Sequence, residues 1–384
     1  MNVSSFPFFY GFFSRKDNSH QFSLRISMRY IGCKNRLLNF IHEFMIKNDV
    51  KGRVFCDLFS GTATVGEYFK KQDYQIFSND ILYSSYIQQR VKIAINQVPS
   101  FDKLVYFLGL DNFQHDYLSN VDKIIDYLNR LEGQDGFIFR NYSPGGTKNQ
   151  MITRMYYTDE NARKIDAIRN TIQLWKNNAL INEDEFSILL YALLNEASDH
   201  ANTTGMFSSF LKHWCKKKTL LPLQLHAPEV SVSNHSHQVH CADSLLLLPQ
   251  LKDIDILYLD PPYTPIQYSN AYHLMETLAR WDSPFIKGVV GARDNSQQKS
   301  LFSSKRYALN ALEQIVQQKN YKHLLLSYSN EGIIPHEEII SLFKKHGTVT
   351  MAENKYKRYS SVCSKSMEPK NHTYERLYYL FPHS

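Results

Sequence analysis

The sequence predicts an α/β protein with a central parallel β-sheet. Short apolar runs that end in a polar or acidic residue alternate with segments of helical periodicity, which is the element order of such a fold. The early runs are continuously apolar, as expected of strands buried on both faces. The expected strands are 54–59, 75–80, 239–243, 255–260, 323–328, 348–352 and 376–381. The expected helices are 34–47, 64–71, 83–96, 272–280, 305–319 and 336–346.

A helix-rich stretch interrupts this alternation between residues 96 and 238. Its helical patterns cover 121–131, 158–177 and 183–197, and a loop is expected over 139–148. We interpret the stretch as a second, mainly helical domain inserted between the second and third strands of the sheet. The predicted organisation is an N-terminal extension (1–28), a first part of the sheet domain (29–95), the insert (96–238) and a second part (239–384). Met28 directly precedes the first organised segment, so translation could start at Met1 or at Met28.

Composition narrows the class of protein. The 384 residues are 43% hydrophobic and 21% charged, which suits a globular core and excludes wholesale disorder. No apolar stretch approaches the length of a membrane span, so no membrane partner is expected. Five cysteines favour reduced thiols in a cytoplasm over a disulfide framework. The net charge of +7 is concentrated at the two ends of the chain, a pattern that fits a polyanionic partner.

The first motif with chemical content covers residues 57–66, Asp-Leu-Phe-Ser-Gly-Thr-Ala-Thr-Val-Gly, between an expected strand and helix. A turn at Gly61 allows a ligand to approach the backbone amides. Ala63 stands where a dinucleotide fingerprint has its second glycine, which favours a cofactor without pyrophosphate. Asp80 ends the next strand, where an acidic residue can accept hydrogen bonds from ribose hydroxyls.

The second motif is Asp260-Pro261-Pro262-Tyr263, directly after an expected strand. Two consecutive prolines mark a rigid loop at the carboxyl end of the strand, where open α/β sheets bind ligands. The loop presents a carboxylate, backbone carbonyls and an aromatic ring at fixed spacing. This set suits a flat base with an exocyclic amine, because the ring can stack on the base while the oxygens accept the amine hydrogens.

Together these motifs resemble the D12 class of adenine-specific DNA methyltransferases, which includes the Dam methylases. They occur in the family's order, and the insert lies where that class carries its target-recognition domain. The resemblance implies a Rossmann-like methyltransferase sheet that binds S-adenosylmethionine (S-adenosyl-L-methionine). The chain departs from the family pattern at Ala63, where glycine is usual. The segments that carry the resemblance are 29–34, 57–66 and 260–263, with weaker likeness at 268–284 and 355–359, so that it spans about 29–381.

The resemblance implies roles for individual residues. The 57–66 loop would hold the methionine part of S-adenosylmethionine, Asp80 its ribose and Asp243 its adenine amine. Lys34 would lie near both cofactor and catalytic loop. Asp243 and Asp260 end adjacent predicted strands and are therefore expected to face one crevice. The complete cofactor set is Tyr30, Lys34, Asp57, Phe59, Gly61, Asp80, Asp243 and Asp260.

The implied reaction is direct in-line transfer of a methyl group to adenine N6. Asp260 would orient the target amine beside the Pro261 carbonyl, and Tyr263 would stack on the extruded base. Because the sulfonium is already a strong electrophile, no metal is required, and alignment and charge stabilisation supply the catalysis. A paired adenine must first leave the duplex stack.

Contacts to double-stranded DNA are expected from the insert and the basic ends. Polar and aromatic residues flank the expected loop 139–148, where arginine could contact guanine edges and lysine a phosphate. A run of lysines at 216–218 could also hold phosphates. The candidate DNA-binding residues are Arg140, Tyr142, Lys148, Arg154, Tyr156 and Lys216.

Alternatives remain open at this stage. An RNA adenine-N6 methyltransferase and a DNA-binding protein with a vestigial methylase site are the rival functions. A metal site is the rival interpretation of a group of histidines near the end of the insert, but their spacing lacks a paired Cys-x-x-Cys element. A restriction-modification role implies a companion restriction endonuclease acting on the same site, in the cytoplasm of a prokaryote and associated with its nucleoid. The histidine group is His226, His235, His237 and His240, with Cys241.

Overall fold

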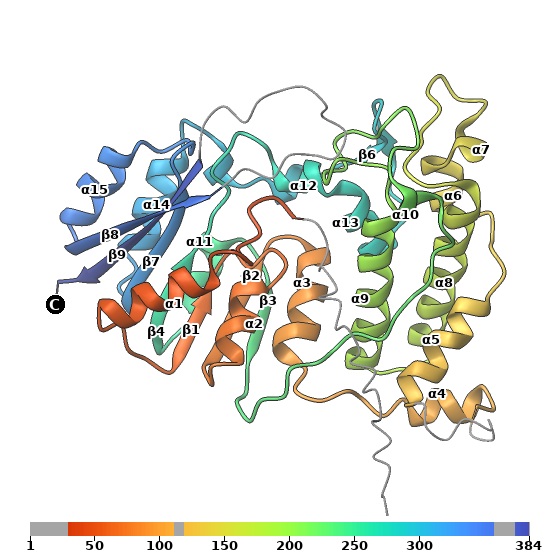
Figure 1. The fold of residues 1–384 in the computed structure, drawn as a ribbon, viewed down its shortest axis with the longest axis horizontal. Coiled ribbons are helices and arrows are strands. Elements are labelled where there is room, and N and C mark those ends of the chain that lie inside the picture. Colours follow the sequence, from red (N-terminus) through yellow and green to blue (C-terminus); the bar gives the residue numbers. More distant parts are fainter. Residues whose placement is uncertain (1–29, 111–118, 357–372, 384) are drawn as a thin grey trace, which may run out of the picture.

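The structure is a computed structural model that describes residues 30–110, 119–356 and 373–383. The predicted N-terminal extension, 1–28, lies outside the described residues. The main sheet has seven strands. It occupies the left-hand half of the molecule in Figure 1. Its strands are β1 (Val54–Asp57), β2 (Gln75–Asp80), β3 (Gln238–Cys241), β4 (Ile254–Leu259), β7 (Tyr321–Ser329), β8 (Gly347–Tyr356) and β9 (Thr373–Pro382).

The strand order, β3-β2-β1-β4-β7-β9-β8, confirms the predicted α/β fold. The first five strands in that order run parallel, and β9 pairs antiparallel with both β7 and β8. Asp57 at the end of β1 is in register with Ser78 on one side and Tyr258 on the other. One expectation was wrong: β3 and β4 are not neighbours, because β2 and β1 lie between them. The chain changes direction across the sheet between β1 and β4.

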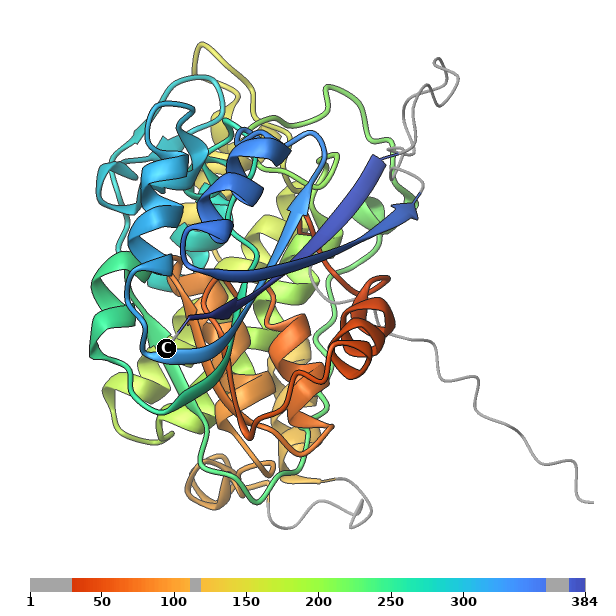
Figure 2. The same ribbon diagram turned by 90° about the vertical axis from the view of Figure 1, so that its left-hand side faces the viewer.

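Helices cover both faces of the sheet (Figure 2). Successive residues of a strand point to opposite faces, so β4 buries Ile256 and Tyr258 on one side and Leu257 and Leu259 on the other. The first face packs on α1 (Leu38–Lys47) and α2 (Thr64–Lys70). The second packs on α11 (Ser244–Leu247), α14 (Ala308–Val316) and α15 (His336–Lys344).

A helical region lies beside the sheet, on the right of Figure 1. Its long helices start at strong caps: Thr158 accepts from the Asn161 amide at α8, and Asn182 with Glu185 forms a capping box at α9. The helices between β2 and β3 are α3 (Tyr83–Gln89), continued by a π-helical turn Arg90–Ala94, α4 (Asp102–Phe107), α5 (Asn120–Arg130), α6 (Phe137–Tyr142), α7 (Pro144–Thr147), α8 (Asp159–Asn177), α9 (Glu183–His200) and α10 (Lys217–Leu220).

The hydrophobic core of this region extends beyond the predicted boundaries at 96 and 238. It includes Leu82 and Ile87 from the start of α3 and Leu274 and Leu278 from α13 (His273–Arg280), which follows α12 (Tyr268–Ala271). The region therefore shares one core with elements of the sheet domain. A small antiparallel hairpin, β5 (Ile286–Lys287) and β6 (Ala292–Arg293), follows α13.

The expectation of a loop over 139–148 was wrong, because the segment forms α6 and α7. Asp166 on α8 accepts from the amides of Gly136, Ile138 and Phe139 and so satisfies the start of α6. Ser143 caps α7 by accepting from the Gly146 amide, and a proline follows it at the first helical position. None of the helices among the described residues is both long enough and apolar enough to span a bilayer.

Candidate active site

A pocket of about 960 Å³, partly open to solvent, lies at the carboxyl ends of the parallel strands. This is the edge at which open α/β sheets bind ligands, beside the point between β1 and β4 where the chain changes direction. Asp243 and Asp260 both line it, as expected, although their strands are not neighbours. Every residue predicted to bind the cofactor lines this pocket: Tyr30, Lys34, Asp57, Phe59, Gly61, Asp80, Asp243 and Asp260.

The 57–66 loop is fixed by hydrogen bonds from within and from β2. The Gly66 amide donates to Asp57 Oδ2 over 3.3 Å, and the Gly61 amide donates to Asp80 Oδ2 over 2.9 Å. Gly61 has φ +52, and a Cβ there would lie 2.7 Å from the ring of Tyr30, so the turn needs glycine. Ala63 also adopts the left-handed conformation, at φ 56, which explains why glycine is usual at this position in the resembling family.

Two residues of β2 hold the neighbouring pocket wall. Asn79, which sequence reasoning missed, donates to the carbonyls of Leu58 and Ala242 and accepts from the Ala242 amide. It thereby ties the loop after β1 to the loop after β3. Asp80 also accepts from the Leu82 amide over 2.9 Å, and Asp243 accepts from the Leu245 amide at the start of α11.

Lys34 connects the loop 260–263 to β9, which lies near the end of the sequence. Its Nζ lies 2.9 Å from Asp260 Oδ1 and 2.8 Å from Glu375 Oε1 on β9. Both Lys34 and Glu375 are buried, whereas 17% of the Asp260 side chain remains exposed on the pocket. Sequence reasoning missed Glu375, which is one residue before the strand expected at 376–381.

Burial dominates the electrostatics of the pocket carboxyl groups. It raises the pKa values of Asp57, Asp80 and Asp260 to about 7 each. Repulsion from Asp260 adds to the shift of Asp57, and repulsion from Glu375 adds to that of Asp260. For Lys34, burial alone would lower the pKa, but the adjacent carboxylates of Asp260 and Glu375 outweigh it and raise that pKa well above its usual range. A cationic ligand in the pocket would favour the ionised forms of these carboxyl groups and so lower their raised pKa values.

The other residues of the loop 260–263 differ in burial and in whether they line the pocket. Pro261 is buried and does not line the pocket, whereas Pro262 does. The Tyr263 ring is half-buried, and Lys34 Nζ lies 5.6 Å from its centroid. Its edge-to-face contact with Tyr328, at 6.0 Å, fixes the orientation of the ring.

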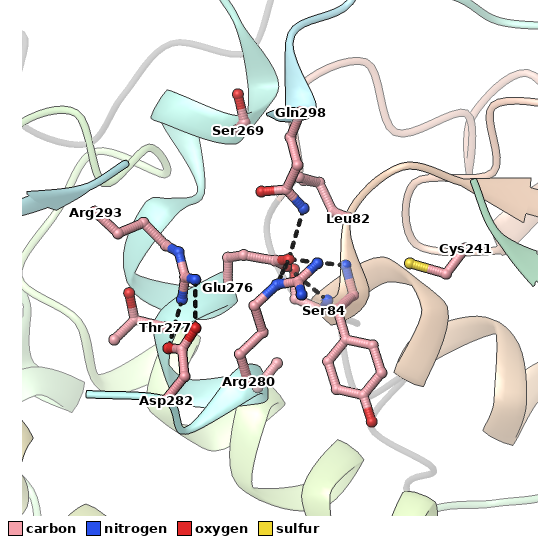
Figure 3. A network of polar contacts seen from close by, with 12 residues as sticks. Leu82, Ser84, Cys241, Ser269, Glu276, Thr277, Arg280, Asp282, Arg293 and Gln298 are labelled. Carbon is pink, nitrogen blue, oxygen red and sulfur yellow. Dashed lines mark hydrogen bonds and ion pairs between the residues drawn. The ribbon is translucent and has the colours of Figure 1, made fainter. Parts of the chain in front are cut away.

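A second buried carboxylate, Glu276 on α13, lies at the centre of a polar network that includes the pocket-lining residue Gln298 (Figure 3). It accepts from the amides of Tyr83 and Ser84 at the start of α3, from Arg280 Nε and from Gln298 Nε2. Gln298 lines the pocket and also donates to the Ile81 carbonyl. Nothing in the sequence pattern marked either Glu276 or Gln298.

The structure separates the residues predicted to bind DNA. Tyr142 and Tyr156 are fully buried, and their hydroxyls donate to the carbonyls of Gly291 and Phe207. Arg154 is 7% exposed, and its guanidinium donates to the carbonyls of Gly288, Val289 and Asn141. These three predictions are corrected: the side chains satisfy the protein's own backbone and are not on a surface that DNA can reach.

The other candidates keep some exposure. Arg140 and Lys148 are exposed at the ends of α6 and α7. Lys216 is half-buried and donates to the Ala201 carbonyl.

Tyr142 and Arg154 hold the β5–β6 hairpin in place through hydrogen bonds to its backbone carbonyls. At this hairpin the side chains of Phe285 and Val289 are 79% and 57% exposed.

The histidine group does not assemble. His226 pairs with Glu196, His235 pairs with Asp73, and His237 accepts from the Ile76 amide. Among the described parts of the chain, no group of His, Cys, Asp or Glu side chains has a metal-binding arrangement.

The fold and pocket define a class: an α/β protein with a candidate ligand site at the carboxyl edge of a mainly parallel sheet. The chain belongs to the D12 class N6 adenine-specific DNA methyltransferase family, whose model matches residues 30–342. That match covers most of the sheet and the whole helical region.

Individual relatives agree with this assignment. The chain is 39% identical over 358 residues to the type II methyltransferase M.FokI of Planomicrobium okeanokoites, and 37% identical over 344 residues to the modification methylase LlaI of Lactococcus lactis subsp. lactis. These matches cover 92% and 87% of the chain but about half, 52%, of each relative. The chain is also 33% identical to the type II methyltransferase M.NlaIII of Neisseria lactamica, covering 92% of the chain and 99% of that relative.

Proposed function

We propose that the protein transfers a methyl group from S-adenosylmethionine to the N6 amine of adenine in double-stranded DNA. The observation that carries the proposal is the position of Asp260. Its carboxylate follows β4, is held by Lys34 and lines the same pocket as the residues predicted to bind the cofactor. The family and the type II methyltransferase relatives support the same reaction.

The pocket residues fit S-adenosylmethionine, which supplies an electrophilic methyl group on a positively charged sulfur. The carboxyl groups of buried Asp57 and of half-buried Asp80 and Asp260 suit the cationic sulfonium and ammonium groups. Apolar side chains, including Phe59 and Phe302, suit the flat adenine ring. The same pocket is lined by the residues expected to hold the cofactor and by Asp260 of the loop expected to hold the extruded base.

The chain's own groups would align the reaction. Asp260 would accept a hydrogen bond from the target amine, and Tyr263 would stack on the base beside it. Lys34 would hold Asp260 in place, because it contacts the carboxylate at 2.9 Å and lies 5.6 Å from the Tyr263 ring. Alignment of this kind can supply several kcal/mol of the barrier reduction.

The DNA contact we propose differs from the one predicted from sequence. The exposed Arg140 and Lys148 remain candidates for phosphate contacts. The β5–β6 hairpin adds exposed Phe285, Lys287 and Val289, held in place by buried Arg154. Buried Arg154 and Tyr142 would thus act on DNA indirectly, by fixing the hairpin.

The biological setting is part of the proposal. Relatives named type II methyltransferase and modification methylase support a role in a restriction-modification system, with a companion restriction endonuclease that acts on the same site. Action on chromosomal DNA would place the protein at the nucleoid, in the cytoplasm of a prokaryotic cell.

The test is incubation of the purified protein with labelled S-adenosylmethionine and either unmethylated duplex DNA or RNA, followed by nucleoside analysis. We expect label in N6-methyl-2′-deoxyadenosine from the DNA only. Label in RNA alone would favour the RNA methyltransferase, label on cytosine would contradict the target, and DNA binding without label would indicate a vestigial site.

A further inference from the structure

The ionic contacts of Lys34 join three segments that are distant in the sequence. Lys34 precedes α1, Asp260 follows β4, and Glu375 lies on β9 near the other end of the chain. The Lys34 Nζ is 2.9 Å from one carboxylate and 2.8 Å from the other. When all three groups are ionised, one positive charge faces two negative charges, and the cluster has a net charge of −1.

Glu375 is an unusual member of this cluster. It is 1% exposed, and its Oε1 accepts from both Lys34 Nζ and Ser327 Oγ, the latter over 2.6 Å. Its Oε2 is buried and has no hydrogen-bond partner among the described residues. A buried carboxylate with an unsatisfied oxygen costs stability, and an apolar residue would remove that cost. Its presence beside Asp260 therefore calls for a functional explanation.

We propose that Glu375 is a positioning residue for the methyl transfer, which keeps Lys34 from neutralising Asp260. By sharing the ammonium group, Glu375 lets Lys34 orient the Asp260 carboxylate while the cluster retains an excess negative charge. This inference rests on the function proposed above and extends it to a residue that does not contact the substrate.

The charge flow of the reaction gives this arrangement a purpose. The N6 lone pair forms the new N–C bond, the S–C bond breaks with its electrons on sulfur, and N6 then releases one proton to solvent. Positive charge thus passes from sulfur to the amine beside Asp260. A cluster with net negative charge stabilises that charge as it develops, whereas a neutral Lys34–Asp260 pair does so less.

The electrostatics of Asp260 provide a readout that a purely structural role would not change. Burial raises its pKa, Lys34 lowers it, and Glu375 raises it further, with a result of about 7. Removal of the Glu375 charge should therefore lower the Asp260 pKa and move the acidic limb of the rate profile to lower pH. The titratable and charged groups around Asp260 are Lys34, Asp57, Tyr258, Tyr263, Tyr268 and Glu375.

Glu375→Gln isolates the charge, because the amide oxygen can still accept from Lys34 and Ser327. Methylation of duplex DNA at saturating cofactor should be measured from pH 5.5 to 9. We expect the plateau rate to fall ~10–100-fold and the acidic limb to move to lower pH, with the cofactor KM changed less than ~3-fold. Glu375→Asp keeps the charge and should retain the wild-type limb.

Glu353→Gln is the matched control, because Glu353 lies on the neighbouring strand β8 and pairs with Arg376 at the surface. It should match the wild type in rate and in pH profile. A Glu375→Gln profile with an unmoved limb would overturn the inference, as would an equal shift in the control.

Infrared titration of the carboxyl groups in the free protein tests the same inference without activity. The Asp260 band, assigned with Asp260→Asn, should titrate at lower pH in Glu375→Gln than in the wild type, and an unmoved band would overturn the inference. The two proposals can fail separately. If the wild type transfers no label to adenine but the Asp260 band still titrates at lower pH in Glu375→Gln, the proposed function is refuted and the electrostatic link between Glu375 and Asp260 is retained.

Discussion

Two buried carboxylate centres flank the same pocket, and they are built differently. Glu276, with no exposed surface, has three donors on Oε1 and one on Oε2, from α3, α13 and Gln298 (Figure 3). The Lys34 centre instead serves two carboxylates with one ammonium group, and Glu375 Oε2 lacks a partner among the described residues. A fully bonded carboxylate stabilises the fold, whereas an incompletely neutralised one retains charge for a ligand.

The largest effect is expected at the reactive centre. Asp260→Ala should reduce methylation of duplex DNA ~10²–10⁴-fold, because in the proposed reaction the target amine would lose its acceptor. The protein should still fold, since Lys34 keeps Glu375 as its partner at 2.8 Å. Cofactor affinity, measured by calorimetry, should change less than ~10-fold.

Asp126→Ala serves as the control for that variant, because Asp126 is a surface residue of α5 paired with Arg130. It should leave the rate unchanged. Turnover by Asp260→Ala within a few-fold of the wild type would refute the role of Asp260 and remove the contrast between the two centres.

Substitution of Glu276 should lower the stability of the protein and leave the methylation rate nearly unchanged. Glu276→Gln replaces an acceptor oxygen by a donor, so one of the buried amides or side chains loses its partner. We expect the free energy of unfolding to fall by ~1–3 kcal/mol, measured by urea denaturation. The rate per folded molecule at saturating cofactor should stay within a few-fold of the wild type.

Glu338→Gln, at an exposed position on α15, is the matched control and should leave stability unchanged. If Glu276→Gln instead abolished the rate with little loss of stability, Glu276 would belong to the reactive centre, and the distinction between the two carboxylates would fail.

Protonation of Asp260 should change activity and stability in opposite directions. Burial raises the Asp260 pKa to about 7. A carboxyl group whose folded pKa lies above its unfolded value binds protons more readily when folded, so its contribution to stability rises as pH falls from 8 to 5. In the proposed reaction ionised Asp260 is the form that would accept from the amine, so the rate should fall over the same interval.

Asp260→Asn isolates this group from others that titrate in the range. The variant's stability advantage over the wild type should shrink as pH falls from 8 to 5, as measured by denaturation at each pH. A constant difference across that interval would show that Asp260 does not titrate there.

The sequence predicted which residues line the pocket more accurately than which residues of the insert are exposed, and the reason is physical. Parallel strands end at one edge of a sheet, so polar residues such as Asp57, Asp80 and Asp260 at strand ends must lie near one another. All three line the pocket. Glu375 could not be found in this way, because β9 runs antiparallel and its pairing with β7 is a long-range contact that no local pattern records.

The insert was harder to interpret because the spacing of charged and aromatic residues does not reveal their direction. The Pro-Gly-Gly run suggested an exposed loop, yet Ser143 and Asp166 organise it into helices. Tyr142 and Arg154 then point inward and satisfy backbone carbonyls of the hairpin that follows α13. Only the tertiary contacts distinguish a side chain that holds the hairpin in place from one that is exposed for contact with DNA.

The smallest effect is expected for Gln298, which contacts Glu276 and also lines the pocket. Gln298 donates to Glu276 Oε1 over 2.8 Å and to the Ile81 carbonyl over 3.2 Å. Gln298→Ala leaves Glu276 three donors, so it should cost no more than ~1 kcal/mol of stability. Because Gln298 and Ile81 line the pocket, cofactor affinity should weaken ~3–10-fold in calorimetry while the rate at saturation is unchanged. Gln297→Ala, at the exposed neighbouring position, should change neither. A loss of saturated rate in Gln298→Ala would mean that this wall aligns the reaction as well as holding the cofactor, so that Glu276 and Asp260 would act on the same step.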